Sequence, residues 1–189
     1  MKNLHILGIC GSLRRQSFNH RALQEAAESM PAHMRMANAS LSGIPLYDGD
    51  VEAEQGIPQA VQHLKARIVA ADGLLIVTPE YNNSMPGVLK NTIDWLSRPP
   101  ADIPRVFRGR PVAIMGATPG QGGTLLSQAA WLPVVRTLGM RPWFEGRVNV
   151  SGAGKVFDTD GRVADEAIRD RIRTFVEGFT GFVDIQRSR

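Results

Sequence analysis

The sequence LHILGICGSLRRQSFNHR, residues 4–21, joins an apolar segment to a polar turn and the beginning of an amphipathic helix. Residues 4–10 are almost all apolar, which is typical of a strand buried on both faces inside a parallel sheet. Gly11 then lets the backbone turn closely before a helix whose first N–H groups are free. Short polar side chains and two cations follow the glycine: Ser12, Arg14, Arg15, Ser17 and Asn19.

This combination favours a phosphate monoester as the ligand of the turn. Free N–H groups at a helix start carry partial positive charge, and guanidinium groups match the geometry of phosphate oxygens. An alternative stays open, in which Ser17 or Asn19 only caps the helix while Arg14 and Arg15 are solvated.

The composition describes one ordinary globular domain spanning residues 1–189. It has 43% apolar and 21% charged residues, and no run approaches the roughly 18 apolar residues of a membrane span. The apolar start of the chain ends at a glycine turn, so we interpret it as a strand and not as a signal peptide, and we expect a cytoplasmic protein. The single cysteine, Cys10, is expected to be a buried, unreactive thiol.

The formal charge of +4 favours small anionic ligands, but the arginines are scattered, and no basic block is interleaved with aromatic residues. Neither nucleic acid nor a membrane is therefore an expected partner. The four histidines show no HExxH spacing, so no metal site is expected. The GxSxG turn of many hydrolases is missing as well.

Five strand-like segments alternate with five amphipathic helical ones. Strands are expected at 4–10, 34–40, 74–78 and 142–150, with another at the start of 111–124. Helices are expected at 17–30, 57–71, from Pro86 onward, at 123–138 and at 164–183. The acidic, turn-rich segment 43–58 is expected to be an exposed loop. Pro133 is expected to kink or split its helix near Trp131.

The alternation predicts a doubly wound parallel sheet with right-handed crossovers. Ligands of such sheets bind at the carboxyl ends of the strands, so the turns after the first, third and fourth strands are expected to converge on one ligand. Neither the P-loop pattern nor GxGxxG is present, which leaves a monophosphate site among the nucleotide sites considered.

Three segments carry a resemblance to a known family: GSLRRQSFN (11–19), PEYNNSMPGVLKNTIDW (79–95) and ATPGQGG (117–123). They resemble the signature stretches of the NADPH-dependent FMN reductases, the group that includes bacterial quinone and chromate reductases. The resemblance implies a flavodoxin-like α/β fold: a doubly wound five-stranded parallel sheet of strand order 2-1-3-4-5 with helices on both faces. It also implies bound FMN as the cofactor and NADPH or NADH as the hydride donor.

By this resemblance, three groups of residues surround the FMN. The phosphate is expected on Ser12, Arg14, Ser17, Phe18 and Asn19. The isoalloxazine ring is expected beside Pro79, Glu80, Tyr81 and Asn82, with Ser84 nearby. Its other edge is expected under Thr118, Pro119, Gly120, Gln121 and Gly122. An aromatic ring and amide donors in the middle loop suit the alternating donors and acceptors of a flavin.

The implied chemistry is hydride transfer at flavin N5, so no catalytic side chain is expected. We expect NAD(P)H to stack on the open flavin face, transfer a hydride and leave, before a quinone, free flavin or similar acceptor takes its place in a ping-pong cycle. Chromate and azo compounds are further candidate acceptors. Two alternatives remain open, an electron carrier of the flavodoxin type and a flavin-binding sensor without turnover.

The resemblance also implies a homodimer or homotetramer, with the helix that follows the PEYN loop between subunits. Trp95, Leu96 and Trp131 are candidates for that contact, and the alternative is that they belong to the core. A kink at Pro133 would change which face of its helix a tetramer uses.

Overall fold

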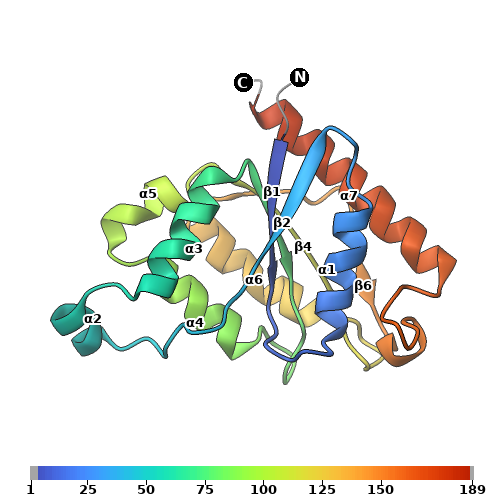
Figure 1. Cartoon of the computed structure of the whole chain (residues 1–189), viewed down its shortest axis with the longest axis horizontal. Coiled ribbons are helices and arrows are strands. Elements are labelled where there is room, and N and C mark those ends of the chain that lie inside the picture. The colour runs from blue at the N-terminus through green and yellow to red at the C-terminus, as the bar shows by residue number, and fades with distance from the viewer. Residues whose placement is uncertain (1–3, 188–189) are drawn as a thin grey trace.

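A parallel sheet forms the centre of the molecule, and helices cover both of its faces (Figure 1). The computed structural model describes residues 4–187. The strands are β1 (Leu4–Cys10), β2 (Met34–Ala39), β3 (Gly73–Val77), β4 (Pro111–Ala117), β5 (Arg141–Pro142) and β6 (Asn149–Val150). All pairings are parallel, in the order β2-β1-β3-β4-β5, and β6 pairs with β4 as well. The expected flavodoxin-like strand order is confirmed.

The helices form two layers, one on each face of the sheet. One layer contains α1 (Phe18–Glu28) and α7 (Glu166–Arg187), and the other contains α3 (Gln59–Ala70), α4 (Gly87–Leu96) and α6 (Leu125–Thr137). Shorter helical segments lie in the connections: α2 (Gly49–Gln55), α5 (Ile103–Val106) and 3-10 turns at Pro100–Asp102 and Ala153–Lys155. Within residues 4–187, no helix combines the length and the apolarity that crossing a membrane requires.

The central strand β1 shows why its sequence is apolar throughout. Ile6 belongs to the core that α1 and α7 form with the sheet, whereas Leu7 and Ile9 belong to the core on the α3, α4 and α6 side. Each of these three side chains is fully buried, which contributes about 1.5–3 kcal/mol per residue. Burial on both faces thus fixes β1 in the middle of the sheet and aims its carboxyl end at the turn that follows.

The expected strand at 142–150 is wrong as one continuous element. Only its two ends are strands. Pro142, in β5, pairs with Val112, and Asn149, in β6, pairs with Gly116. The residues between β5 and β6 leave the sheet. Trp143 is buried against Phe175 of α7, with ring centroids 5.0 Å apart. The chain leaves the edge of β4 after Trp143, whose side chain belongs to the core on the α1 and α7 side of the sheet.

Two helical expectations also need correction. The segment expected to be a loop at 43–58 contains α2, which Asp48 caps by accepting a hydrogen bond from the Asp50 N–H. The helix with Pro133 is not split, since α6 runs unbroken from Leu125 to Thr137, and a kink at Pro133 stays a prediction. Pro133 is exposed on this helix, so its missing N–H leaves no buried carbonyl without a donor.

The proposed subunit contact through Trp95, Leu96 and Trp131 is wrong, because all three lie in the core of a single chain. Their relative exposures are 0%, 0% and 1%. Trp95 Nε1 donates to the Pro45 carbonyl over 2.9 Å, and Trp131 Nε1 donates to Thr78 Oγ1 over 3.2 Å. Neither indole is available to a second copy.

Candidate functional site

The turn after β1 is organised by its own serines. Ser17 is the N-cap of α1 and its Oγ accepts a hydrogen bond from the Asn19 N–H at 3.2 Å. Ser12 Oγ accepts from the Arg14 N–H, also at 3.2 Å. Both serines are buried, whereas Arg14 and Arg15 are exposed. The cap that we considered as an alternative is therefore present, but the Ser17 hydroxyl can still donate its own hydrogen to a ligand.

Asn19 has a different place from the one expected. Its Nδ2 donates to the Ala117 carbonyl at 2.8 Å, and its Oδ1 accepts from the Ala117 N–H at 2.9 Å. Asn19 is 3% exposed, so this pair of hydrogen bonds is shielded from water. The side chain thus fastens the start of α1 to the end of β4, which brings the first and third loops together.

Phe18 also faces away from the turn. Its ring stacks on Phe157, with centroids 5.7 Å apart and planes inclined by 21°. The Arg21 guanidinium lies over the same ring, 5.8 Å from its centroid. Phe18 can therefore meet a phosphate through its backbone N–H but not through its ring.

The middle loop is a two-residue hairpin. Tyr81 and Ser84 exchange backbone hydrogen bonds of 3.1 and 3.0 Å, and the two residues between them, Asn82 and Asn83, have φ of 49° and 59°. Positive φ at both central positions is the pattern of a type I′ turn, which asparagine tolerates better than most residues. The hairpin holds Tyr81 on the surface, 48% exposed, so its ring is accessible to a flat ligand.

Glu80 connects this hairpin to α6. Its Oε2 accepts hydrogen bonds from the Leu126 and Ser127 N–H groups, at 2.9 and 3.0 Å. The Thr124 side chain makes no cap at the start of α6, so a carboxylate from another loop satisfies the first donors of that helix. We expected Glu80 beside the flavin ring, and the structure gives its carboxylate this structural partner.

A buried polar cluster reinforces the same junction. Thr78 Oγ1 lies 2.9 Å from Ser127 Oγ and accepts the hydrogen bond of the Trp131 indole. Thr78 and Ser127 have no exposed surface. The end of β3 is therefore attached to the first two turns of α6 by side chains as well as by Glu80.

The third loop, residues 118–122, is supported by β6 and by the residues that follow it. The Thr118 N–H donates to the Val150 carbonyl at 2.9 Å, and the Gly152 N–H donates to the Gly120 carbonyl at 3.0 Å. Pro119, Gly120, Gln121 and Gly122 are exposed on the other side. Sequence reasoning missed this support, because residues 149–153 carry no recognised motif that would indicate which loop they contact.

Two glycines allow the three loops to approach one another. A Cβ on Gly11 would lie 3.0 Å from side-chain atoms of both Pro79 and Leu89. A Cβ on Gly116 would lie 2.1 Å from the Thr78 carbonyl, which is closer than atoms can approach. The three expected loops thus meet at one edge of the sheet because glycine stands at both junctions.

Cys10 is the last residue of β1, and its thiol is not reactive. Burial raises the pKa of its thiol from 9.0 to about 11, and hydrogen bonds with Ser12 and Ser17 offset only part of that effect. The thiol is therefore protonated at neutral pH, as expected for an unreactive cysteine.

Comparison with known proteins identifies the family. Residues 4–155 match the family model described as NADPH-dependent FMN reductase. The chain belongs to this family. It is 46% identical to an NAD(P)H-dependent FMN reductase of Pseudomonas aeruginosa over 171 residues, 90% of each chain. It is 35% identical to a 2-hydroxy-1,4-benzoquinone reductase of a Burkholderia species, covering 97% of this chain and 98% of the relative.

Solved structures agree with this assignment. FerB of Paracoccus denitrificans, a flavoenzyme NAD(P)H:(acceptor) oxidoreductase, superimposes with a TM-score of 0.86 at 29% identity, over 97% of this FMN reductase family member and 98% of that chain. The expected family, fold and oxidoreductase class are therefore confirmed. The individual FMN contacts stay predictions.

The residues present suit FMN. The first loop offers serine hydroxyls, an exposed arginine and a helix start, which match a phosphate dianion. The second offers the exposed Tyr81 ring, and the third offers backbone N–H groups of Gln121 and Gly122 that form no hydrogen bond within residues 4–187. A Cβ on Gly122 would meet nothing within 4 Å, so the surface above this loop is open to a ligand.

Proposed function

We propose that this protein is an NAD(P)H oxidoreductase that holds FMN in the three-loop site and reduces quinones, free flavin or similar small acceptors. The observation that carries the proposal is the meeting of residues 11–19, 79–84 and 118–122 at one sheet edge, in a chain of FMN reductase sequence. The name of the Burkholderia relative supports quinones as the acceptor class. Chromate and azo compounds would be side substrates of the same open site.

Ser12, Arg14 and Ser17 would hold the phosphate in this proposal. The Ser17 hydroxyl donates its hydrogen to a phosphate oxygen while its lone pair accepts from the Asn19 N–H. The exposed Arg14 guanidinium supplies paired N–H donors, and the Phe18 N–H points from the first turn of α1. Asn19 acts as a positioning residue, since its backbone N–H and its side chain are both already bonded.

The second and third loops would enclose the ring. Pro79, Tyr81, Asn82 and Ser84 line one side, and Thr118 to Gly122 line the other. The N–H groups of Gln121 and Gly122, which are unbonded within residues 4–187, would be available to stabilise negative charge on the pyrimidine edge of a bound ring. When bound, FMN supplies reversible hydride transfer at N5, so the chain needs no nucleophile of its own.

Donor and acceptor would use the same open face in turn. If the second and third loops contact the edges and one side of the ring, one face would remain open to NAD(P)H and then to the acceptor. Ping-pong kinetics follow from this sharing. Glu80 is the one acidic residue in loops 11–19, 79–84 and 118–122, and its carboxylate is bonded to α6, so no residue there is expected to select one dinucleotide by its ribose, and either is expected to serve.

We further propose that the protein is a cytoplasmic homodimer or homotetramer. A groove of about 340 Å³ between α4 and α6 is lined by Ile93, Ile103, Pro133 and Val134, and it offers an apolar surface beside the buried tryptophans. Analytical ultracentrifugation of the protein and of a Val134→Asp variant tests this surface. An unchanged mass for the variant would argue against it.

The deciding experiment is the absorbance spectrum of the purified protein, followed by anaerobic addition of NADPH. We expect flavin bands, release of FMN and not FAD on denaturation, bleaching by NADPH, and recovery of the bands on adding a quinone. A protein that binds FMN but is not bleached by NADPH or NADH would instead be a carrier or a sensor. The net charge of +4 and the arginine-bearing loop favour the reductase, since the flavodoxin type of carrier is normally acidic.

A further inference from the structure

The edge of β4 carries a second concave site, where the chain leaves the sheet between β5 and β6. The Val112 carbonyl accepts a hydrogen bond from the Trp143 N–H at 2.9 Å, and the Gly116 N–H donates to the Val148 carbonyl at 3.2 Å. Between these two bonds the chain bulges away from β4. The bulge leaves a gap in the ladder at Ile114.

The backbone of Ile114 faces this gap. On the opposite edge of β4, the Met115 carbonyl accepts from the Thr78 N–H, so Ile114, one residue earlier, points its N–H and C=O to the open side. On that side β5 pairs only up to Val112 and β6 only from Gly116, and neither group of Ile114 bonds to a loop within residues 4–187. An unpaired donor and acceptor side by side on a partly buried strand require water or a ligand as partner.

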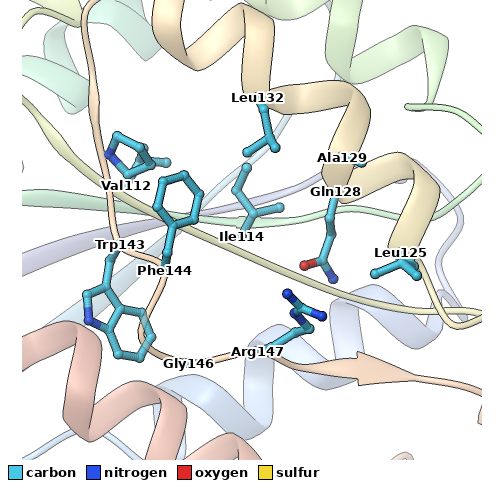
Figure 2. A pocket seen from close by; sticks show the side chains of 11 residues that line it. Val112, Ile114, Leu125, Gln128, Ala129, Leu132, Trp143, Phe144, Gly146 and Arg147 are labelled. Carbon is cyan, nitrogen blue, oxygen red and sulfur yellow. The ribbon is translucent and has the colours of Figure 1, made fainter.

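Apolar side chains form the walls above Ile114, as Figure 2 shows. Leu132 comes from α6, and Trp143 and Phe144 come from the bulge. Trp143 is held rigidly against Phe175 and is only 7% exposed, whereas Phe144 is 68% exposed. The cavity has a volume of about 180 Å³. A cavity of about 150 Å³ holds one benzene molecule, so this space suits a single aromatic ring.

A cation stands at the rim. Arg147 lines the cavity, is exposed, and forms no ion pair with a carboxylate within residues 4–187. Figure 2 shows its guanidinium directed toward the amide of Gln128. The Nε2 of that amide donates to the Val148 carbonyl at 3.0 Å, so Gln128 is fixed in place. Since no carboxylate of the described residues pairs with Arg147, its guanidinium is available to an anionic ligand.

We propose that this cavity binds a single-ring phenolic carboxylate, at a site separate from the three loops. Its ring would lie between Leu132, Trp143 and Phe144, and its carboxylate would pair with Arg147. A hydroxyl is both a donor and an acceptor, so a phenol can satisfy the C=O and the N–H of Ile114 together. This chemistry matches the three unused features of the cavity: its apolar walls, its strand edge and its cation.

The test uses 4-hydroxybenzoate with the FMN-loaded protein. Isothermal titration calorimetry should detect binding, and the amide resonance of Ile114 should shift in a 15N–1H NMR spectrum. Because an exposed ion pair contributes little, Arg147→Gln should weaken binding by only about three- to fivefold. Phenol, which lacks the charge, should lose a similar factor, and benzoate, which lacks the hydroxyl, should bind more weakly and shift the Ile114 amide resonance less than 4-hydroxybenzoate does.

Two further variants make the result decisive. Ala129→Phe fills the cavity from the exposed side of α6 and should abolish binding, whereas Arg136→Gln, on the same helix but outside the cavity, should leave it unchanged. Binding that survives Ala129→Phe would overturn the proposal, as would a lack of binding at millimolar ligand. The proposal is also wrong if 4-hydroxybenzoate does not bind and Phe144→Ala changes the mass of the protein in solution, because a second copy would then cover this surface.

Discussion

Replacing Glu80 with alanine is expected to loosen two of the three loops at once. The carboxylate accepts the Leu126 and Ser127 N–H groups at 2.9 and 3.0 Å and is the cap of α6. Loss of a helix cap costs about 0.5–2 kcal/mol, and loss of a negative charge at a helix start costs about 0.3–1 kcal/mol. We therefore expect the free energy of unfolding of Glu80→Ala to fall by about 1–2 kcal/mol.

Thermal unfolding without added FMN measures this effect directly. In a chain of this size, each 1 kcal/mol lowers the melting temperature by roughly 2–4 °C, so Glu80→Ala should melt about 2–8 °C below the parent. Glu80→Gln keeps one acceptor oxygen but no charge and should fall between the two. Glu54→Ala, an exposed glutamate of α2, is the matched control and should melt with the parent.

A second measurement addresses the loops themselves. Since Thr78 and Ser127 still join β3 to α6 in the variant, the protein should fold while the hairpin at 81–84 is less ordered. FMN must then order the hairpin when it binds, and this ordering lowers its affinity. An ordering free energy of about 1.4 kcal/mol weakens FMN binding about tenfold. If Glu80→Ala melted with the parent and bound FMN equally well, the carboxylate would not hold the two loops together.

Three further predictions follow from neighbouring contacts. Asn19→Ala should lower the free energy of unfolding by about 2–4 kcal/mol in urea titrations, because it leaves both backbone groups of Ala117 buried without a partner, and an unchanged midpoint would contradict this. Arg14→Gln should weaken FMN binding roughly tenfold or more and reduce its dependence on salt, with Arg15→Gln as the comparison, and equal losses in the two variants would show that the charge acts only at long range. The pKa of Cys10 is raised to about 11 by burial, so the folded state keeps this proton while the unfolded state loses it, and stability should fall as pH rises from 9.0 to about 11. Cys10→Ala should show a smaller fall over that range, and parallel curves would assign the loss to other groups.

The fold was predictable from local patterns because its signals are local. A strand buried on both faces needs an apolar run, as in β1 and β3, and a turn at a sheet edge needs glycine, as at Gly11. The same reasoning overlooked α2, because the sequence signals for this helix are only an N-cap residue, Asp48, and acidic residues in the first turn. It also allowed for a split at Pro133, whereas α6 runs unbroken through this position, where the carbonyl left without a donor belongs to the exposed Ala129.

The expected tryptophan contact failed for a related reason. The sequence shows an apolar stripe on α4 but not what covers it. In the structure, the Pro45 carbonyl accepts the Trp95 indole N–H, from a segment 50 residues earlier in the chain. Burial of a large side chain is a property of the assembled layers, so one helix alone cannot tell a core face from a subunit interface.

By itself, then, the sequence determined the order of strands and helices, the three loops that meet at one sheet edge, and the family to which the chain belongs. Those properties follow from periodicity and from short motifs in which neighbours along the chain act together. Only the tertiary structure decided that Glu80 caps a helix, that Asn19 ties α1 to β4, and that the strand beside β4 breaks to expose Ile114. The contacts of Glu80 and Asn19 join residues 46 and 98 positions apart, and no local pattern specifies which distant backbone group a polar side chain will meet.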